Sequence, residues 1–244
     1  FFREISEEIN ELLTLDIVYG FVVKDNIFYE KEIIKILRKP RIPPQCFNLA
    51  KLLLKKESPV DAVLTTNFDR KLEGACLRLE KQYKEVGEGI REVHFIFDRD
   101  GFNTSEVKKY RGNLDSTQAF VFKLHGTLTI PQMILADYKD LRKKHKFTWQ
   151  REAINKALNV STGNDKCLII LGYSGRDPLV MKALKSALGR SKGRGRVDVY
   201  WINKSITEIH RRLAKVFKAG EVFLHSGIDS HDFLRILTFN LGRV

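Results

Sequence analysis

The chain has 244 residues, of which 43% are hydrophobic, so it can bury the core of one medium-sized domain. Its 43 Lys and Arg against 30 Asp and Glu give a net charge of +13, which favours a polyanionic partner such as nucleic acid but is also typical of proteins from heat-loving organisms. No apolar run has the length of a bilayer, and no secretory signal stands at the start, so we expect a cytoplasmic protein that does not span a membrane. The three cysteines lie far apart without a CxxC pair, so we expect neither a disulfide framework nor a zinc site built from cysteine pairs.

The first part of the chain is predicted to be helical. It begins with Phe1-Phe2-Arg3 rather than with Met, so we expect the natural N-terminus to lie further upstream. Apolar residues at helical spacing predict an amphipathic helix from Phe2 to Leu13, and a second helix is expected from Tyr29 to Arg38, before Pro40. A third helix is expected from Gln45 to Lys55.

Strands and helices alternate over the rest of the chain. Apolar runs predict strands at 61–65, 91–98, 119–124, 167–171, 197–202 and 222–224. Helices are expected at 70–80 and 178–188, a helix-rich stretch at about 141–158, and a closing helix that begins with residues 232–237. This alternation indicates a single α/β domain over residues 1–244 with a doubly wound, mostly parallel, Rossmann-like sheet. We expect residues 102–116 to form a loop insertion and residues 139–160 a small helical insertion.

Small and polar residues follow the ends of three predicted strands. These motifs are Thr65-Thr66-Asn67-Phe68-Asp69, then Lys123-Leu124-His125-Gly126, then Leu171-Gly172-Tyr173-Ser174-Gly175-Arg176-Asp177. Ligands bind in α/β sheets beyond the carboxyl ends of the strands, where an Asn amide, an Asp carboxylate and a His would offer donors, acceptors and a base. Each motif alone is equally explained by an ordinary turn, so the interpretation depends on their order.

A polar cluster near the C-terminus has two interpretations. His225, Asp229, His231 and Asp232 could bind a metal, but a polar turn before a helix explains them as well, and nothing fixes a third ligand. We therefore predict no metal site.

In their order, the strand-end motifs resemble the sirtuin-like superfamily, and more closely its bacterial and archaeal branch that hydrolyses NAD, often in antiviral defence. The resemblance continues through Met133-Ile134-Leu135-Ala136-Asp137-Tyr138, Trp201-Ile202-Asn203 and Asp232-Phe233-Leu234, and it covers the chain from about residue 60 onward. It implies NAD as the substrate and no metal. Protein-deacetylating sirtuins carry a four-cysteine zinc module, which three scattered cysteines cannot build, so deacetylation is disfavoured.

The resemblance also implies roles for individual residues. Asn67 would position water or the nicotinamide ribose, and His125 would engage the ribose hydroxyls or activate water, so these two are the expected catalytic residues. Asp69 would lie near the nicotinamide carboxamide. The other residues expected to bind NAD are Thr65, Thr66, Gly126 and Tyr173, with Gly172 and Ser174 on the phosphate and adenosine-ribose side and Asn203 at the adenine ribose.

The activity implied is attack of water that releases nicotinamide and leaves ADP-ribose, in a defence effector switched on by a protein partner or by self-assembly. The family also has a glycine-rich loop that holds the pyrophosphate, and none is found upstream of residue 60. We expect this loop in an N-terminal segment missing from the chain; the alternative is a site that no longer binds NAD productively. The alternative function is a non-catalytic module that binds NAD or ADP-ribose, or holds nucleic acid on its basic surface.

Overall fold

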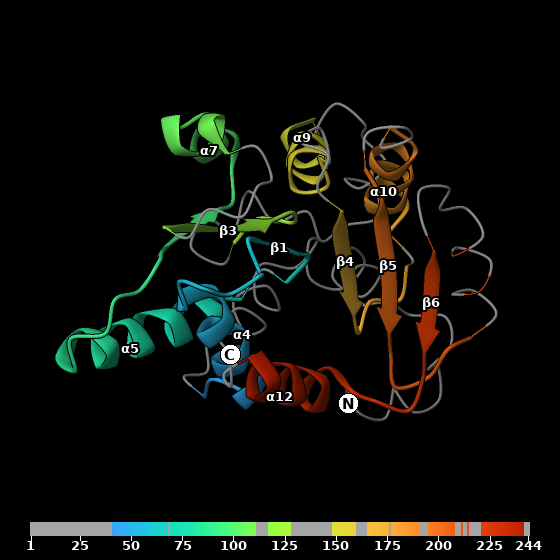
Figure 1. The fold of residues 1–244 in the computed structure, drawn as a ribbon. Coiled ribbons are helices and arrows are strands. Elements are labelled where there is room, and N and C mark those ends of the chain that lie inside the picture. The colour runs from blue at the N-terminus through green and yellow to red at the C-terminus, as the bar shows by residue number, and fades with distance from the viewer. Residues whose placement is uncertain are drawn as a thin grey trace, which may run out of the picture.

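The computed structural model describes residues 41–67, 69–110, 117–127, 148–159, 165–175, 177–190, 195–207, 211, 214 and 221–241. The helices predicted at 2–13 and 29–38 and the motif at 133–138 lie outside these residues. Figure 1 shows the described helices and strands, which occur in the following order: α4 (Pro44–Leu54), β1 (Ala62–Thr65), α5 (Lys71–Glu85), β2 (Glu92–Ile96), α6 (Arg99–Phe102), α7 (Ser105–Lys109), β3 (Gln118–Lys123), α9 (Thr148–Ala157), β4 (Lys166–Leu171), α10 (Pro178–Arg190), β5 (Val197–Ile202), β6 (Val222–His225) and α12 (Ser230–Leu241).

All pairings between the named strands are parallel. Strand β3 lies between β1 and β2 in one three-stranded sheet, and β5 lies between β4 and β6 in another. Parallel neighbours require crossover connections, and helices supply several of them here. The predicted α/β, Rossmann-like fold with parallel strands is confirmed, and its described strands divide between two sheets.

Helix α5 is longer than the sequence predicted. It was expected to end at Glu80 but continues to Glu85, five residues further. Tyr83 packs against the core beneath the helix, and Lys84 bonds to Glu80 one turn earlier at 2.6 Å. The helix ends just before Gly87, which adopts a φ of 72° that favours glycine.

The two sheets share one hydrophobic core. On β3, Phe120 and Phe122 join residues of β4, β5, α9 and α10 in a single cluster, whereas Ala119 and Val121 face a second cluster formed with α4 and α5. This alternation is that of a strand covered on both faces, with α4 and α5 on one side and α6, α7 and α9 on the other (Figure 1).

A half-buried polar contact joins the amino ends of the two sheets. Asp61, directly before β1, lies 3.9 Å from the amine of Lys166 at the start of β4, and the Tyr110 hydroxyl donates to the same carboxylate at 3.0 Å. Burial lowers the pKa of Lys166, while Asp61 acts in the opposite direction. The pair holds β1 and β4 in place at this edge.

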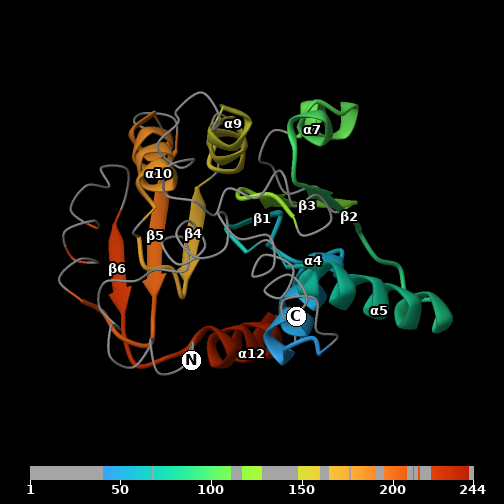
Figure 2. The ribbon, with the colours of Figure 1, turned by 180° about the vertical axis from the view of Figure 1, so that it is seen from behind.

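The C-terminal helix returns to the first described helix. Helix α12 packs against α4, as Figure 2 shows, and side chains of Lys55 and Thr238 donate to carbonyls of Leu241 and Asn48 at 2.9 and 3.3 Å. No described helix is long and apolar enough to cross a membrane.

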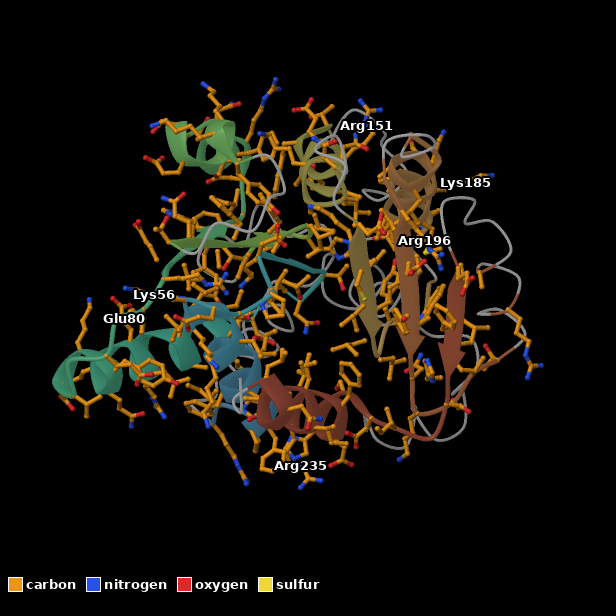
Figure 3. The ribbon with its side chains drawn as sticks, in the orientation of Figure 1. Lys56, Glu80, Arg151, Lys185, Arg196 and Arg235 are labelled. Carbon is orange, nitrogen blue, oxygen red and sulfur yellow. The ribbon has the colours of Figure 1, made fainter. Side chains whose placement is uncertain are left out.

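Basic side chains and cysteines each occur on several helices and strands of the fold. In Figure 3, Arg151 on α9 and Lys185 on α10 lie on one side of the molecule and Arg235 on α12 lies on the other. All three cysteines, Cys46, Cys76 and Cys167, are free in the structure. Burial raises the pKa of Cys46 to about 11 and that of Cys76 to about 12, so both thiols stay protonated near neutral pH.

Arg91 connects the amino end of β2 to the end of α4. Its side chain is 1% exposed. The guanidinium donates to the carbonyls of Leu52 (2.8 Å), Leu53 (3.0 Å), Ser58 (3.5 Å) and Val60 (2.7 Å). A cation at the carboxyl end of a helix also complements the helix dipole, so Arg91 stabilises the junction of α4 with the sheet.

We predict that Arg91→Met lowers the free energy of unfolding by about 3 kcal/mol, because buried carbonyls that lose their donor cost about 1–3 kcal/mol each. Chemical denaturation followed by circular dichroism measures the change. Lys56→Met, at an exposed cation nearby, is the control and should stay within about 0.5 kcal/mol of the wild type. Equal stability of the Arg91 and Lys56 variants would contradict this role.

Candidate active site at the carboxyl ends of the strands

Main-chain hydrogen bonds align the segments that carry the predicted site residues. The Leu124 N–H donates to the Thr65 carbonyl at 2.8 Å, which holds the end of β3 against the end of β1. The Gly172 N–H donates to the Ile202 carbonyl at 3.1 Å, which does the same for β4 and β5. The loops after these strands therefore start at aligned strand ends within each sheet.

In the loop after β1 (residues 66–69), local hydrogen bonds hold the described residues Asn67 and Asp69, and the Asn67 side chain is exposed. The Asn67 N–H donates to Oγ1 of Thr65 at 3.0 Å, and the Lys71 N–H at the start of α5 donates to Oδ1 of Asp69 at 2.9 Å. Thr65, Thr66 and Asp69 are half-buried, whereas Asn67 is exposed. The Asn67 amide is therefore presented at the surface of the site.

Lys123, the last residue of β3, lies beneath this loop. Its side chain is 2% exposed. The amine donates to the Asp69 carbonyl and, at 2.6 Å, to the carboxylate of Glu73 on α5. Sequence reasoning gave Lys123 no role of its own. The available signal was a lysine in an apolar strand, since a buried amine requires a partner.

His125 bonds to Asp177, which connects the turn after β3 to the start of α10. Their side chains are 12% and 7% exposed, and His125 Nε2 lies 2.7 Å from Asp177 Oδ2. The other oxygen, Oδ1, accepts from the N–H groups of Leu179 and Val180 in the first turn of α10, at 2.8 and 3.1 Å. Asp177 therefore caps α10 and holds the imidazole at the same time.

The bond to Asp177 fixes which nitrogen of His125 is available for chemistry. An ionised carboxylate only accepts hydrogen bonds, so Nε2 carries the hydrogen, and in the neutral ring Nδ1 is left as the acceptor. Sequence reasoning included Asp177 in a motif but assigned it no role. The available signal was an Asp directly before Pro178, the usual pattern at the start of a helix.

The loop after β4 meets the end of β5. The Tyr173 carbonyl accepts from Trp201 Nε1 at 3.0 Å and from Asn203 Nδ2 at 3.5 Å, so the structure brings Tyr173 and Asn203 together. Gly172 is exposed with a φ of 60°, and an added Cβ would meet no atom within 4 Å. Ser174 is exposed beside it. A ligand could thus approach this backbone closely.

Some of the predicted site residues are not joined to one another by direct contacts. Among the described residues, no hydrogen bond or ion pair links Asn67 to His125 or to Asn203, so their roles at the two riboses stay predictions.

Gly126 adopts a φ of 84°, and its N–H donates to the Lys123 carbonyl at 3.0 Å in the turn that presents His125.

The C-terminal cluster is divided between the end of β6 (His225), the residue before α12 (Asp229) and the first turn of α12 (His231 and Asp232). Oδ1 of Asp229 accepts from the Asp232 N–H at 2.9 Å, at the start of α12. In the described part of the chain, no three His, Cys, Asp or Glu side chains gather as metal ligands would. Whether the protein uses a metal stays a prediction.

We predict that Asp177→Ala is less stable than Asp177→Asn by about 1 kcal/mol, because Ala removes the cap of α10 whereas Asn can keep it. Thermal and denaturant unfolding of both variants measure the difference. Leu77→Ala, at an exposed position on α5, serves as a surface control. If both Asp177 variants unfold at the same temperature and denaturant concentration as the wild type, the contacts of Asp177 with His125 and with the first turn of α10 do not stabilise the fold.

The comparison with protein families matches residues 61–220, more than half of the chain, to the family described as SIR2-like domain. A search among curated proteins found no match. The matched range begins directly before β1 and includes every predicted site residue, from Thr65 to Asn203. SIR2-like domains bind NAD.

Proposed function

Because the chain belongs to the SIR2-like domain family, we propose that it is an NAD+ glycohydrolase that cleaves the bond between nicotinamide and ribose. The observation that carries this proposal is the His125–Asp177 pair, at 2.7 Å. It provides an oriented imidazole at the carboxyl ends of the strands, within the residues that match the family. An oriented base is what hydrolysis requires beyond ligand binding.

The reaction balances with water as the only other reactant. The bond between the anomeric carbon and the nicotinamide nitrogen breaks, and nicotinamide leaves as a neutral molecule with the electron pair. The ribose develops oxocarbenium character, as in other glycoside cleavages. Water adds to the anomeric carbon, and its proton passes to Nδ1 of His125 and then to solvent. The products are nicotinamide, ADP-ribose and one proton.

The charges of the described site suit this transition state. Asp69 lies in the loop after β1 and Asp177 at the start of α10, and fixed carboxylates stabilise positive charge that develops on a sugar. The exposed amide of Asn67 can orient the ribose or the water, which converts binding energy into correct geometry. Neither step requires a metal.

The loop after β4 suits the adenosine side of NAD. A Cβ added at Gly172 would meet no atom, so a ligand has room beside this backbone. The side chain of Asn203 bonds to the carbonyl of the next residue, Tyr173, and in this proposal it also contacts a ribose hydroxyl. The N–H groups of Leu179 and Val180 already bond to Asp177, so in this proposal the pyrophosphate is bound by other parts of the chain than the first turn of α10.

In this proposal the enzyme serves as an antiviral-defence effector, held inactive until a protein partner or self-assembly activates it. The support is the resemblance of the motifs to the defence-associated branch, together with the harm that uncontrolled loss of NAD would cause. The basic surface is a candidate contact for nucleic acid, and such binding would weaken steeply with added salt.

We predict that the full-length protein releases nicotinamide from NAD, and that Asn67→Ala and His125→Ala each reduce this rate at least ~100-fold. Chromatography that separates nicotinamide, ADP-ribose and NAD measures the rate and the stoichiometry. Asn240→Ala, at an exposed amide on α12, is the matched control and should retain the wild-type rate.

Two results would change the assignment. Binding of NAD or ADP-ribose without release of nicotinamide, also in the presence of candidate activators, would favour a non-catalytic binding module. Release that is unchanged in both site variants would show that another part of the chain performs the chemistry.

A further inference from the structure

Lys123 is a buried cation that takes no part in the proposed reaction. It follows Ala119 and Val121 on the face of β3 that packs toward α4 and α5, where the other side chains are apolar. The side chain is 2% exposed. Removing an ammonium group from water is costly, so its partners indicate what it is retained for.

The amine of Lys123 has two partners with different consequences. The carboxylate of Glu73, 13% exposed and 2.6 Å away, neutralises its charge. The second partner, the Asp69 carbonyl, belongs to the loop that presents Asn67. An ion pair with Glu73 alone would satisfy the charge, so the bond to Asp69 attaches the loop to the core of the sheet in addition.

A second buried cation in the described part of the chain, Arg91, shows the contrast. Arg91 lies at the amino end of β2 and donates to carbonyls at and after the end of α4, away from the strand ends that carry the site. Lys123 lies at the carboxyl end of β3, two residues before His125. It bonds to Asp69, two residues after Asn67, and lies two residues before His125, so it is close in the chain or through its bond to both expected catalytic residues.

We infer that Lys123 is a positioning residue, which fixes the loop after β1 so that Asn67 meets the ribose or the water in the productive geometry. This inference rests on the proposed NAD-cleaving function. Among the described residues, the local bonds of the loop run from Asn67 back to Thr65 at the end of β1 and from Lys71 at the start of α5 to Asp69. In the same residues, the side-chain contact that ties the loop to β3 is the bond from Lys123 to the Asp69 carbonyl, 54 residues away in the chain.

The decisive variant is Lys123→Met combined with Glu73→Met. Replacing a buried ion pair by apolar side chains of similar volume is often neutral for stability, so the variant can stay folded while the Asp69 carbonyl loses its donor. We expect kcat for nicotinamide release to fall at least ~10-fold with KM for NAD changed less than ~3-fold, because the loop loses orientation rather than contacts. Amide hydrogen exchange of a peptide covering residues 64–70 should accelerate ~10-fold or more.

Two matched variants separate positioning from stability. Arg91→Met should unfold more easily but, at a temperature where it is folded, keep the wild-type kcat and loop exchange. Glu73→Gln keeps an acceptor for Lys123 and should keep both values as well. If the double Met variant does not fold, Lys123→Met with Glu73→Gln replaces it, since it also leaves no unpaired carboxylate.

The results can overturn the inference at two points. Unchanged exchange in the loop would show that Lys123 does not anchor it, and faster exchange with unchanged kcat would show that the anchor does not serve the reaction. If the wild type itself releases no nicotinamide, the proposed function fails and the catalytic part of the inference fails with it. Loop exchange then still decides whether Lys123 holds the loop.

Discussion

The hydrogen bond between His125 and Asp177 is the contact on which the candidate site depends. It joins the turn after β3, in one sheet, to the start of α10, the helix that follows β4 of the other sheet, at 2.7 Å. Because Asp177 also accepts two N–H groups of α10, the imidazole is oriented by a helix that packs on the shared core. The chemistry of the site is thereby coupled to the packing of both sheets.

Other polar contacts position the strands and loops around the His125–Asp177 hydrogen bond. Asp61 and Lys166 hold the amino ends of the two sheets together, while main-chain bonds at Leu124 and Gly172 align the strand ends within each sheet. Lys123 then attaches the loop of Asn67 from below. Buried polar contacts of this kind cost desolvation and are specific in geometry, which suits a site that must be rigid before substrate binds.

The sequence predicted the elements well where local pattern decides them. Strand β5 was expected at 197–202 and lies there, because an apolar run between polar segments defines a buried strand. The polar loops at the strand ends were also found. Asp177 and Lys123 received no role because their partners lie 52 and 50 residues away, and no local pattern shows which distant side chain a buried charge will meet. The end of α5 was missed since packing of Tyr83 extends the helix.

The state of the His125 ring tests the central claim most directly. Nitrogen NMR of the protein labelled with ¹⁵N-histidine, at a pH where the ring is neutral, distinguishes the nitrogen that carries hydrogen from the one that does not. The His125–Asp177 bond predicts a protonated Nε2 and an unprotonated Nδ1, with the arrangement altered in Asp177→Asn. A protonated Nδ1 in the wild type, or a ring unaffected by Asp177→Asn, would contradict an oriented base at this position.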